Sequence, residues 1–190
     1  MSFRHKIIPM KTPNKTKFAI LGLLTIEPLS GYDIKKFIDQ TLSYFWAESN
    51  GQLYPALQEL TKSKWISLKK PSFKEKKARK LYSITDLGLL ELKKWLRSEE
   101  EKSVHRDEGL LKLFFGTNID KEECMQHLKN RRARMKSRLT EFQSILHQLQ
   151  KRSSPHHLYW LLTLYNGIHS VKAEIRWCNQ SIKILEGRSS

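Results

Sequence analysis

The chain has 190 residues, enough for one domain or two small ones, and its 39% hydrophobic content excludes wholesale disorder. Thirty-five Lys and Arg against 19 Asp and Glu give a formal net charge of +16, which predicts attraction to a polyanion such as nucleic acid or an acidic membrane surface. No run reaches the ~18 apolar residues of a membrane span and the two cysteines, Cys124 and Cys178, form no pairing motif, so we expect a cytoplasmic protein without disulfides and without a membrane partner.

The positive charge is uneven along the chain. Residues 1–98 carry 19 basic and 8 acidic side chains, a net charge of +11, whereas residues 99–190 carry 16 and 11, a net charge of +5. The first half is therefore expected to face the polyanion. Residues 1–15 contain Pro9 and Pro13 but no apolar core and no small-residue cleavage site, so they are predicted to form a flexible basic arm rather than a signal peptide.

Two short helices are predicted after the arm. Residues 16–26 carry apolar side chains at helical spacing, and Pro28 ends that pattern. Ser30 followed three residues later by Asp33 is a capping box, in which the hydroxyl and the carboxylate each satisfy a free N–H group. The second helix is expected to run from there to about Leu42.

A third helix is predicted in the segment 49–60, whose core-facing stripe at i, i+4 and i+7 is Leu53, Leu57 and Leu60. The start of this helix is ambiguous. Ser49 with Gln52 is a second capping box, yet Pro55 cannot donate an N–H and is tolerated only in a first turn. We therefore favour a start at Gly51 or Gln52, or a distorted first turn.

Two strands and a fourth helix are predicted next. Residues 65–70 and 79–84 alternate apolar and polar side chains, and the polar segment 71–77 connects them as a hairpin. Thr85-Asp86 caps the fourth helix, in which Gly88 is expected to allow close packing. Most apolar side chains of this helix are expected to be buried, namely Leu87, Leu90, Leu92, Trp95 and Leu96.

The acidic segment 98–105 is expected to separate a first domain, residues 16–98, from a second domain, residues 106–186, that contains only helices. Helices are predicted over residues 107–116, 120–151 and 155–185. Asp120 with Glu123 marks the start of the middle helix, and Ser154 is expected to cap the last one.

Three short helices followed by a two-stranded wing is the order of a winged helix-turn-helix, so the predicted fold class is mostly α, with this domain followed by long C-terminal dimerisation helices. The third helix would enter the major groove of DNA, where Asn and Gln can pair with adenine, while Tyr and Lys can bond phosphates. Tyr54 could instead pack its ring against the hairpin. The residues of this helix expected to bind DNA are Asn50, Gln52, Tyr54, Pro55, Gln58 and Lys62.

The hairpin is strongly basic. From Lys69 to Lys80, twelve residues hold seven basic side chains and one acidic side chain. Such a tip suits phosphates, because each neutralised phosphate releases counterions; the alternative is a charged loop that keeps an edge hairpin soluble. The hairpin residues expected to bind DNA are Lys70, Lys74, Lys76, Lys77, Arg79 and Lys80.

The sequence resembles the PadR family of transcriptional regulators in Gly31-Tyr32-Asp33-Ile34, Gln52-Leu53-Tyr54-Pro55-Ala56-Leu57, Leu81-Tyr82-Ser83-Ile84-Thr85 and Gly88. The resemblance covers residues 16–98 closely, and the helices that follow look like those of the longer members, whose C-terminal helices dimerise. Ser63-Lys64-Trp65-Ile66 departs from the family, which often has a glycine before the first strand. The resemblance implies a homodimer, a roughly palindromic operator on double-stranded DNA, and repression relieved by a small-molecule effector.

The long helices carry heptad-like apolar seams, which suit packing against another long helix. The residues expected to dimerise are Met125, Leu128, Met135, Leu139, Phe142, Leu146, Leu161, Tyr165 and Ile168. A hairpin of the two helices within one chain is the alternative, but two helices alone bury little core and a two-fold DNA reader needs a symmetric contact. The basic cluster at residues 130–138 is either a solvated face or a second contact with DNA.

An aromatic ligand pocket is a further expectation, and it would lie between the two halves of the chain. Trp46, Trp95 and Trp160 are the candidate lining residues, with Trp95 foremost, although spaced Trp residues more often belong to a core. The seven histidines form no metal motif, and no phosphate-binding loop, nucleophile elbow or paired carboxylates are present. We therefore expect neither a metal, nor a cofactor, nor enzymatic activity.

The leading hypothesis is a ligand-responsive, dimeric repressor that binds specific DNA sequences. A basic helical adaptor that binds an acidic protein or membrane surface would explain the charge and the long helices, but not a strand hairpin placed after three helices. An architectural protein that coats DNA without sequence preference is the third hypothesis.

Overall fold

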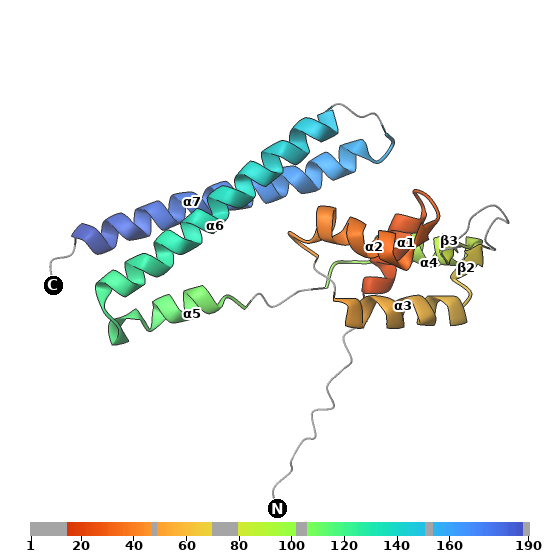
Figure 1. Ribbon diagram of the computed structural model, residues 1–190, viewed down its shortest axis with the longest axis horizontal. Helices are drawn as coiled ribbons and strands as arrows, with labels where there is room; N and C mark the ends of the chain where they lie inside the picture. The colour runs from red at the N-terminus through yellow and green to blue at the C-terminus, as the bar shows by residue number, and fades with distance from the viewer. Residues whose placement is uncertain (1–14, 47–48, 70–79, 102–105, 151–153, 188–190) are drawn as a thin grey trace, which may run out of the picture. The chain divides into compact units, whose positions relative to one another are not determined.

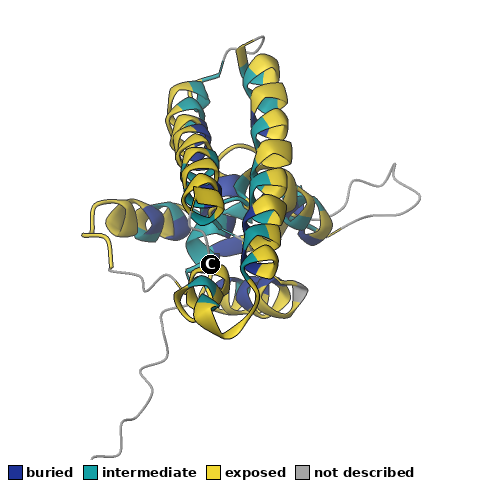
Figure 2. Cartoon of the chain, turned by 90° about the vertical axis from the view of Figure 1, so that its left-hand side faces the viewer, coloured by how far each residue is buried: buried dark blue, intermediate teal, exposed yellow. Residues whose placement is uncertain are grey.

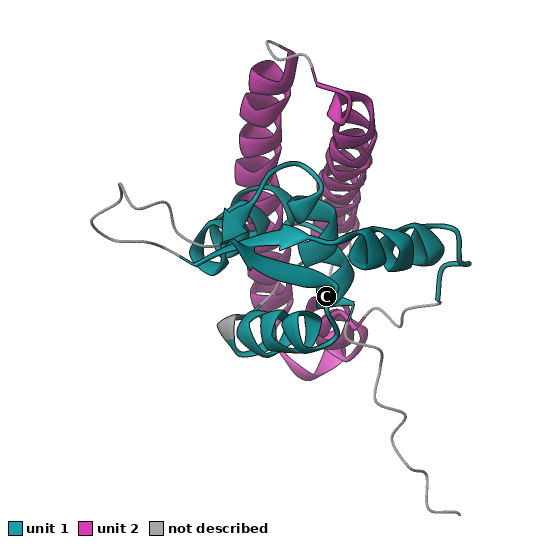
Figure 3. Cartoon of the chain, turned by 90° about the vertical axis from the view of Figure 1, so that its right-hand side faces the viewer, with its two compact units in different colours: residues 1–101 teal, residues 102–190 magenta. Residues whose placement is uncertain are grey.

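The computed structural model describes residues 15–46, 49–69, 80–101, 106–150 and 154–187 (Figure 1). The chain divides into two compact units, residues 1–101 and 102–190, which Figure 3 shows in different colours. Each unit is described by itself below. Within the described ranges, no helix combines the length and the apolar composition that crossing a bilayer requires.

Unit 1 has the winged helix-turn-helix fold that the element order predicted. Its sheet is antiparallel with the order β1-β3-β2. The elements in chain order are α1 (Thr16–Leu24), β1 (Leu29–Ser30), α2 (Gly31–Phe37), the π-helix η1 (Ile38–Leu42), α3 (Asn50–Lys62), β2 (Ile66–Lys69), β3 (Leu81–Ile84) and α4 (Asp86–Leu96).

Strand β1 is an element that the sequence analysis missed. Leu29 pairs with Tyr82 and Ser30 pairs with Leu81, so β1 adds a third strand to the hairpin of β2 and β3. Two residues are too few to show a period-2 pattern. Ser30 also carries the capping signal of the next helix: its hydroxyl accepts from the Asp33 N–H at 3.2 Å and donates to Asp33 Oδ2 at 2.6 Å.

The core of unit 1 lies between α1, α2, α3 and the sheet; Figure 2 colours the buried residues of the chain dark blue. The predicted stripe of α3 is confirmed, because Leu53, Leu57 and Leu60 are all at most 2% exposed. The other side chains of the core that are at most 2% exposed are Ile20, Leu21, Ile34, Ile38, Ala56 and Ile66. The apolar face of α3 is therefore buried in the core, and its polar face points outward.

The expectation that α3 begins at Gly51 or Gln52 is wrong. The helix begins at Asn50 with Ser49 as its N-cap, and the N–H of Ser49 donates to Gln52 Oε1 at 3.4 Å. Pro55 consequently lies inside the helix. The capping interactions and the burial of the Leu stripe outweigh the one backbone hydrogen bond that Pro55 cannot donate.

The end of α3 is a Schellman motif, in which the Trp65 N–H donates to the Leu60 carbonyl at 2.9 Å and the Lys64 N–H donates to the Thr61 carbonyl at 3.1 Å. Lys64 adopts φ = 59°. This is the left-handed conformation that glycine adopts without strain. The segment that lacks the family's usual glycine thus forms the same kind of helix end with a lysine.

The carbonyl oxygen of Trp65 joins β2 to α4. It accepts from the N–H of Thr85 at 3.0 Å, and the Thr85 hydroxyl lies within hydrogen-bond distance of two carbonyl oxygens, that of Lys64 at 2.7 Å and that of Trp65 at 3.0 Å. The Thr85 hydroxyl in turn accepts from the Gly88 N–H at 3.1 Å and so caps α4, as predicted. A Cβ on Gly88 would lie 2.0 Å from the Trp65 oxygen, which confirms the expected close packing at this glycine.

The expectation that the apolar side chains of α4 are mostly buried is wrong. Leu92 is buried, but Leu87, Leu90, Trp95 and Leu96 are between 37% and 65% exposed. The reason is that α4 meets unit 1 along one side only, chiefly through α1, where the rings of Trp95 and Phe18 stack at 4.6 Å. Spacing identifies the apolar positions of a helix but not how many neighbours cover them.

Unit 2 is helical in its described residues, as predicted, with α5 (Glu108–Phe114), the 3-10 helix η2 (Gly116–Asn118), α6 (Lys121–Gln150) and α7 (His157–Gly187). The long helices α6 and α7 run antiparallel and pack on each other within the chain (Figure 1). Leu128, Phe142 and Ile168 are buried in this packing. The sequence analysis gave a hairpin of the two helices within one chain as the alternative, and the structure contains this hairpin. Its packing therefore buries some of the residues that were expected to dimerise.

Replacing Gly88 by Ala is expected to lower the free energy of unfolding by about 1–3 kcal/mol or more, because the added methyl group must displace the backbone of Trp65. Gly22→Ala is the matched control, since a Cβ at Gly22 of α1 has no neighbour within 4 Å; it should raise stability by about 0.5–1 kcal/mol. Urea denaturation measures both variants. If the two substitutions changed the free energy of unfolding equally, the Trp65 carbonyl would not restrict the side chain at position 88.

Replacing Lys64 by Gly is expected to raise the free energy of unfolding by up to about 1 kcal/mol, because glycine relieves the left-handed strain at φ = 59°. Lys62→Gly, two residues earlier and inside α3, should instead lower stability by about 1 kcal/mol. Thermal unfolding of the two variants gives the sign of each effect. A destabilised Lys64→Gly protein would contradict the strain argument.

Candidate functional site

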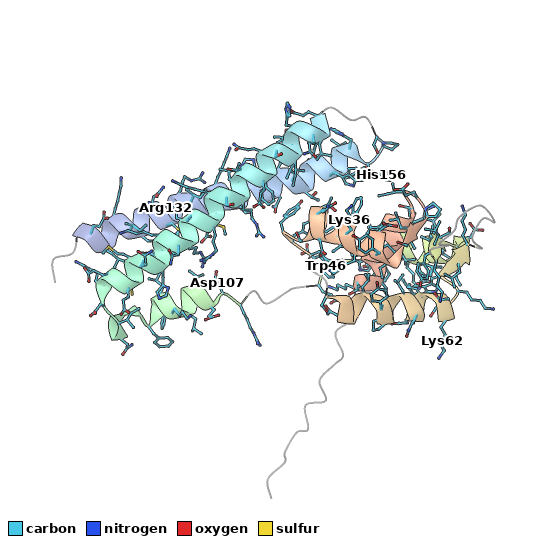
Figure 4. All side chains as sticks on the ribbon, viewed as in Figure 1. Lys36, Trp46, Lys62, Asp107, Arg132 and His156 are labelled. Carbon is cyan, nitrogen blue, oxygen red and sulfur yellow. The ribbon has the colours of Figure 1, made fainter. Side chains whose placement is uncertain are left out.

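The outward face of α3 carries most of the polar residues expected to read DNA. Gln52, Pro55, Gln58 and Lys62 are exposed, and Tyr54 is 48% exposed. Figure 4 shows Lys62 projecting from the end of α3. Asn50 begins the helix. The exposed face of this 13-residue helix can present amides and hydroxyls to base edges and phosphates.

The hairpin beside α3 supplies positive charge at its described base. Lys69 at the end of β2 and Lys80 just before β3 are both exposed. The remaining predicted wing residues, Lys70, Lys74, Lys76, Lys77 and Arg79, lie outside the described residues.

A shallow hollow of about 370 Å³ lies between the start of α2, α3 and β3, and its lining is Ser30, Gly31, Tyr32, Tyr54, Lys80 and Tyr82. The ring of Tyr54 lies over Gly31, where an added Cβ would come within 3.1 Å of Tyr54 Cε1. Tyr54 therefore packs on α2, next to the strand residue Tyr82. Phenol groups and an ammonium group around one hollow suit phosphate oxygens.

Tyr32 and Tyr82 are residues of this face that the sequence analysis did not select. Tyr32 is 62% exposed and Tyr82 is partly buried. Both belong to the runs that carried the family resemblance, but their sequence positions are far from α3. Only the pairing of β1 with β3 brings Tyr82 beside the start of α2.

The three tryptophans expected to line a ligand pocket have local partners in their own units. The ring of Trp95 stacks on Phe18 with an interplanar angle of 4°. The ring of Trp160 stacks on His156 at 5.6 Å between centroids, and the Trp46 N–H donates to the Leu42 carbonyl at 2.7 Å. The rings of Trp95 and Trp160 are thus packed on neighbouring side chains, the bond of Trp46 belongs to the backbone, and a ligand-binding role for the three residues stays a prediction.

The most connected charged group of unit 2 is the Arg131 guanidinium on α6. It donates to both carboxylate oxygens of Asp107, at 2.9 and 2.7 Å, and its Nε donates to Glu174 of α7. The guanidinium also lies 5.3 Å from the ring centroid of Trp177. Arg131 therefore ties the start of α5 (Asp107, labelled in Figure 4) to both long helices.

The contacts with Arg131 change the pKa of Asp107, whose side chain is only 16% exposed. Its hydrogen bonds from Arg131 hold the pKa of this carboxyl far below its usual range, and the Leu110 N–H adds to the effect as Asp107 caps α5. The pKa of Arg131 is raised in return, first by its hydrogen bond to Asp107. The sequence analysis missed this cluster, because its members are 24 and 43 residues apart and Arg131 stood in a run of basic residues.

Neighbouring Arg132 also contacts α7, since its Nη1 donates to Asn179 Oδ1 at 2.8 Å. The basic cluster at residues 130–138 is therefore not uniformly a solvated face. Two of its arginines are structural contacts of the helical hairpin.

Unit 1, with a third helix whose polar face is free beside a basic hairpin, belongs to the class of winged helix-turn-helix DNA-binding transcription regulators. Residues 20–94 match the transcriptional regulator PadR-like family, and residues 105–186 match the family described as virulence activator alpha C-term. The negative transcriptional regulator PadR of Bacillus subtilis is 32% identical over 140 residues, which cover 73% of this chain and 77% of that protein.

Two solved structures are similar over nearly the whole chain. Bacillus subtilis PadR in complex with operator DNA has a TM-score of 0.78 and 30% identity, with 89% of this chain and 98% of that chain covered. Bacillus subtilis PadR in complex with p-coumaric acid has a TM-score of 0.74 and 28% identity, with 94% and 99% covered. The chain belongs to the PadR-like family of transcriptional regulators, and it is a regulator rather than an enzyme.

Replacing Asp107 by Asn is expected to lower the stability of the protein at pH 7 by about 1–3 kcal/mol, because Asn still caps α5 but cannot pair with Arg131. The folded-state pKa of Asp107 is depressed, so its contribution is complete above the unfolded pKa of about 3.9 and is lost as the pH falls further. Denaturation from pH 7 down to pH 2.5 should therefore show the two proteins converging.

The exposed pair of Glu108 and Lys112, at 2.7 Å, provides the control for this series. Glu108→Gln should leave stability nearly unchanged at every pH, because solvent screens the pair. If Asp107→Asn behaved like Glu108→Gln, the Arg131 cluster would not hold unit 2 together.

Proposed function

We propose that the protein is a homodimeric repressor that binds a palindromic operator and is released from it by a small-molecule effector. The observation that carries the DNA-binding part is the juxtaposition, within unit 1, of the outward polar face of α3 with the basic base of the hairpin. One element suits a major groove and the other suits the neighbouring backbone. The similarity to an operator-bound relative supports the same use of the fold.

Within that proposal, the DNA-contacting residues divide by chemistry. Gln52 and Gln58 on α3, with Asn50 at its start, are proposed to read base edges. Tyr54, Lys62 and Lys80, with the wing lysines, are proposed to hold phosphates. Gln52 has two tasks, because the same side chain caps α3 through Ser49, so Gln58 is the cleaner position at which to test base readout.

The dimer part of the proposal is supported by apolar surface that unit 2 leaves uncovered. Phe114, the last residue of α5, is 80% exposed, and Phe115, its C-cap, is 58% exposed. A second group lies at the start of α7, where Leu158, Tyr159 and Leu162 are each more than half exposed. Groups of exposed large apolar side chains are typical of protein–protein contacts. A two-fold partner would cover them and would place two copies of α3 toward two half-sites.

The effector part of the proposal is supported by the relative that was solved with p-coumaric acid. In this chain, the effector would favour the conformation that does not bind DNA. By thermodynamic linkage, DNA would then weaken effector binding by the same factor.

Replacing Lys74, Lys76 and Lys77 by Ala is expected to weaken binding to every DNA duplex, because each lost phosphate contact lowers the salt slope of log K by about 0.9. Fluorescence anisotropy with the promoter of the protein's own gene and with random duplex, each from 50 to 300 mM salt, measures both effects. The control removes the same charge from exposed positions of unit 2 with Lys129, Lys172 and Lys183 changed to Ala. An unchanged slope in the wing variant would remove the wing from the DNA interface.

Replacing Leu162 by Glu is expected to weaken the dimer at least about tenfold, because a charge would be buried in an apolar contact. Gln143→Glu adds the same charge at an exposed polar position of α6 and should leave the dimer intact. Analytical ultracentrifugation of the three proteins gives the masses directly. A wild-type protein that sediments with the mass of one chain would refute the dimer.

A further inference from the structure

The packed pair of long helices in unit 2 has two flanks, and two neighbouring arginines of α6 distinguish them. Arg131 donates to Glu174 of α7, on the flank where it also binds Asp107 at the start of α5. Arg132, labelled in Figure 4, donates instead to Asn179 of α7 at 2.8 Å. Consecutive residues of a helix are about 100° apart, and residues five apart differ by about 140°. The two bonds therefore lie on opposite sides of the line along which α6 and α7 meet.

The flank of Arg132 and Asn179 is basic on both helices. On α7, cations occur seven and three residues before Asn179 and four residues after it, which places them on the same side of the helix. On α6, cations occur three residues before Arg132 and four residues after it. The basic flank consists of Lys129, Arg132, Lys136, Lys172, Arg176 and Lys183.

These cations carry their charge without carboxylate partners in the described part of unit 2. Within the described ranges, none of them forms an ion pair, and all but Arg132 are exposed. The carboxylate of Glu186 follows Lys183 by three residues, in the last turn of α7. The row from Lys172 to Lys183 is about 17 Å long, and like charges one turn apart on a helix repel each other. A partner that brings negative charge would relieve this repulsion.

A hollow of about 460 Å³ on α7 adds an apolar surface to the basic flank. Arg176, Asn179 and Lys183 of the row line it, together with Gln180 and Ile184. Ile184 is 51% exposed. The hollow therefore offers cations, amide groups and one apolar side chain within about two turns of helix. An acidic protein segment can match all three, whereas the phosphates of DNA would leave Ile184 uncovered, and a membrane surface needs several large apolar side chains on the face that it contacts.

We propose that the basic flank binds an acidic, amphipathic helix of another protein, with carboxylates against the cations and an apolar side chain against Ile184. Two helices packed side by side leave a groove for a third helix, and a helix seated in a groove is a common mode of peptide recognition. Charges that flank an apolar contact determine which partner binds, as they do at the edges of coiled coils. The inference goes beyond the proposed function and does not depend on DNA binding.

The chemistry of the basic flank favours a different protein over a second copy of this chain. Two basic flanks that faced each other across a two-fold contact would repel. The apolar residues that support the proposed dimer lie elsewhere in unit 2. Phe114 is at the end of α5, and Leu158 and Leu162 are at the start of α7, where Leu162 precedes Lys172 by ten residues. The dimer contact and the acidic helix therefore use separate surfaces.

The test uses the full chain and two fluorescent peptides of about 20 residues, long enough to lie along the basic flank. One peptide is an amphipathic helix with a row of Leu between two rows of Glu, and the other has the same composition in scrambled order. The test variant combines Arg176→Gln with Lys183→Gln, beside Ile184. The matched control combines Arg134→Gln with Arg138→Gln, two exposed cations of α6 that lie about 200° around the helix from the basic flank.

Fluorescence anisotropy at about 100 mM salt, where exposed charges interact over about 10 Å, measures the affinities. We expect the amphipathic peptide to bind the wild type with a Kd in the micromolar range and the test variant about tenfold more weakly. The control variant should lose less than about twofold, because its cations face away from the peptide. Ile184→Ala should weaken the amphipathic peptide at least about threefold and leave the scrambled peptide unchanged. Circular dichroism shows that each variant is folded.

Several results would overturn the inference. Equal weakening by the test and control variants would show that net charge alone attracts the peptide, and equal affinity for the two peptides would exclude a helical partner. The absence of saturable binding up to about 1 mM would exclude the site itself. Operator affinity, measured on the same proteins, separates this inference from the proposed function. A test variant that lost affinity for the duplex but bound the peptide as the wild type does would assign the basic flank to DNA.

Discussion

The carbonyl oxygen of Trp65 is the point on which the DNA-binding unit depends. Lys64, the residue before Trp65, ends α3 in a left-handed conformation. Thr85, whose side chain caps the start of α4, contacts the same Trp65 oxygen. The Thr85 N–H donates to this carbonyl, the Thr85 hydroxyl lies between it and the Lys64 carbonyl, and Gly88 leaves the space that a Cβ would fill. The end of α3, the first strand of the hairpin and the start of α4 are thereby fixed by one peptide group.

That constraint bears on the proposed function, because reading DNA with α3 and the hairpin would require a fixed position of one relative to the other. The buried Leu stripe of α3 determines which face points outward, and the pairing of β2 with β3 determines where Lys69 and Lys80 lie. The junction at Trp65 therefore fixes the position of α3 relative to the hairpin. Binding then needs little reordering of the backbone, which keeps the entropic cost of association low.

Unit 2 is organised by a different kind of interaction. Its two long helices pack through an ordinary apolar seam, but α5 is held by charge, through Asp107 and Arg131. An ion pair that is mostly removed from solvent is strong only while both partners stay paired. Protonation of Asp107 would remove this pair from α5, whereas the apolar contacts between α6 and α7 do not titrate.

Several features were readable from local sequence because their causes are local. The caps at Ser30 and Thr85 depend on residues within one helical turn, and both were found as predicted. The stripe of α3 follows from helical periodicity alone. The start of α3 was misjudged because the rule for Pro55 was given more weight than the cap at Ser49, and in the folded chain the cap and the core outweigh it.

By itself, the sequence determined the order of the elements, the inward face of α3, the concentration of basic residues in the wing and the membership of a regulator family. It could not determine which apolar faces are covered: α4 remains half exposed, and the seam of α6 is partly used by α7 of the same chain. Nor could it bring together Asp107, Arg131 and Glu174, or Tyr82 and Tyr54. Periodicity and capping act within a few residues, whereas burial and ion pairing depend on which distant segments the folded chain places in contact.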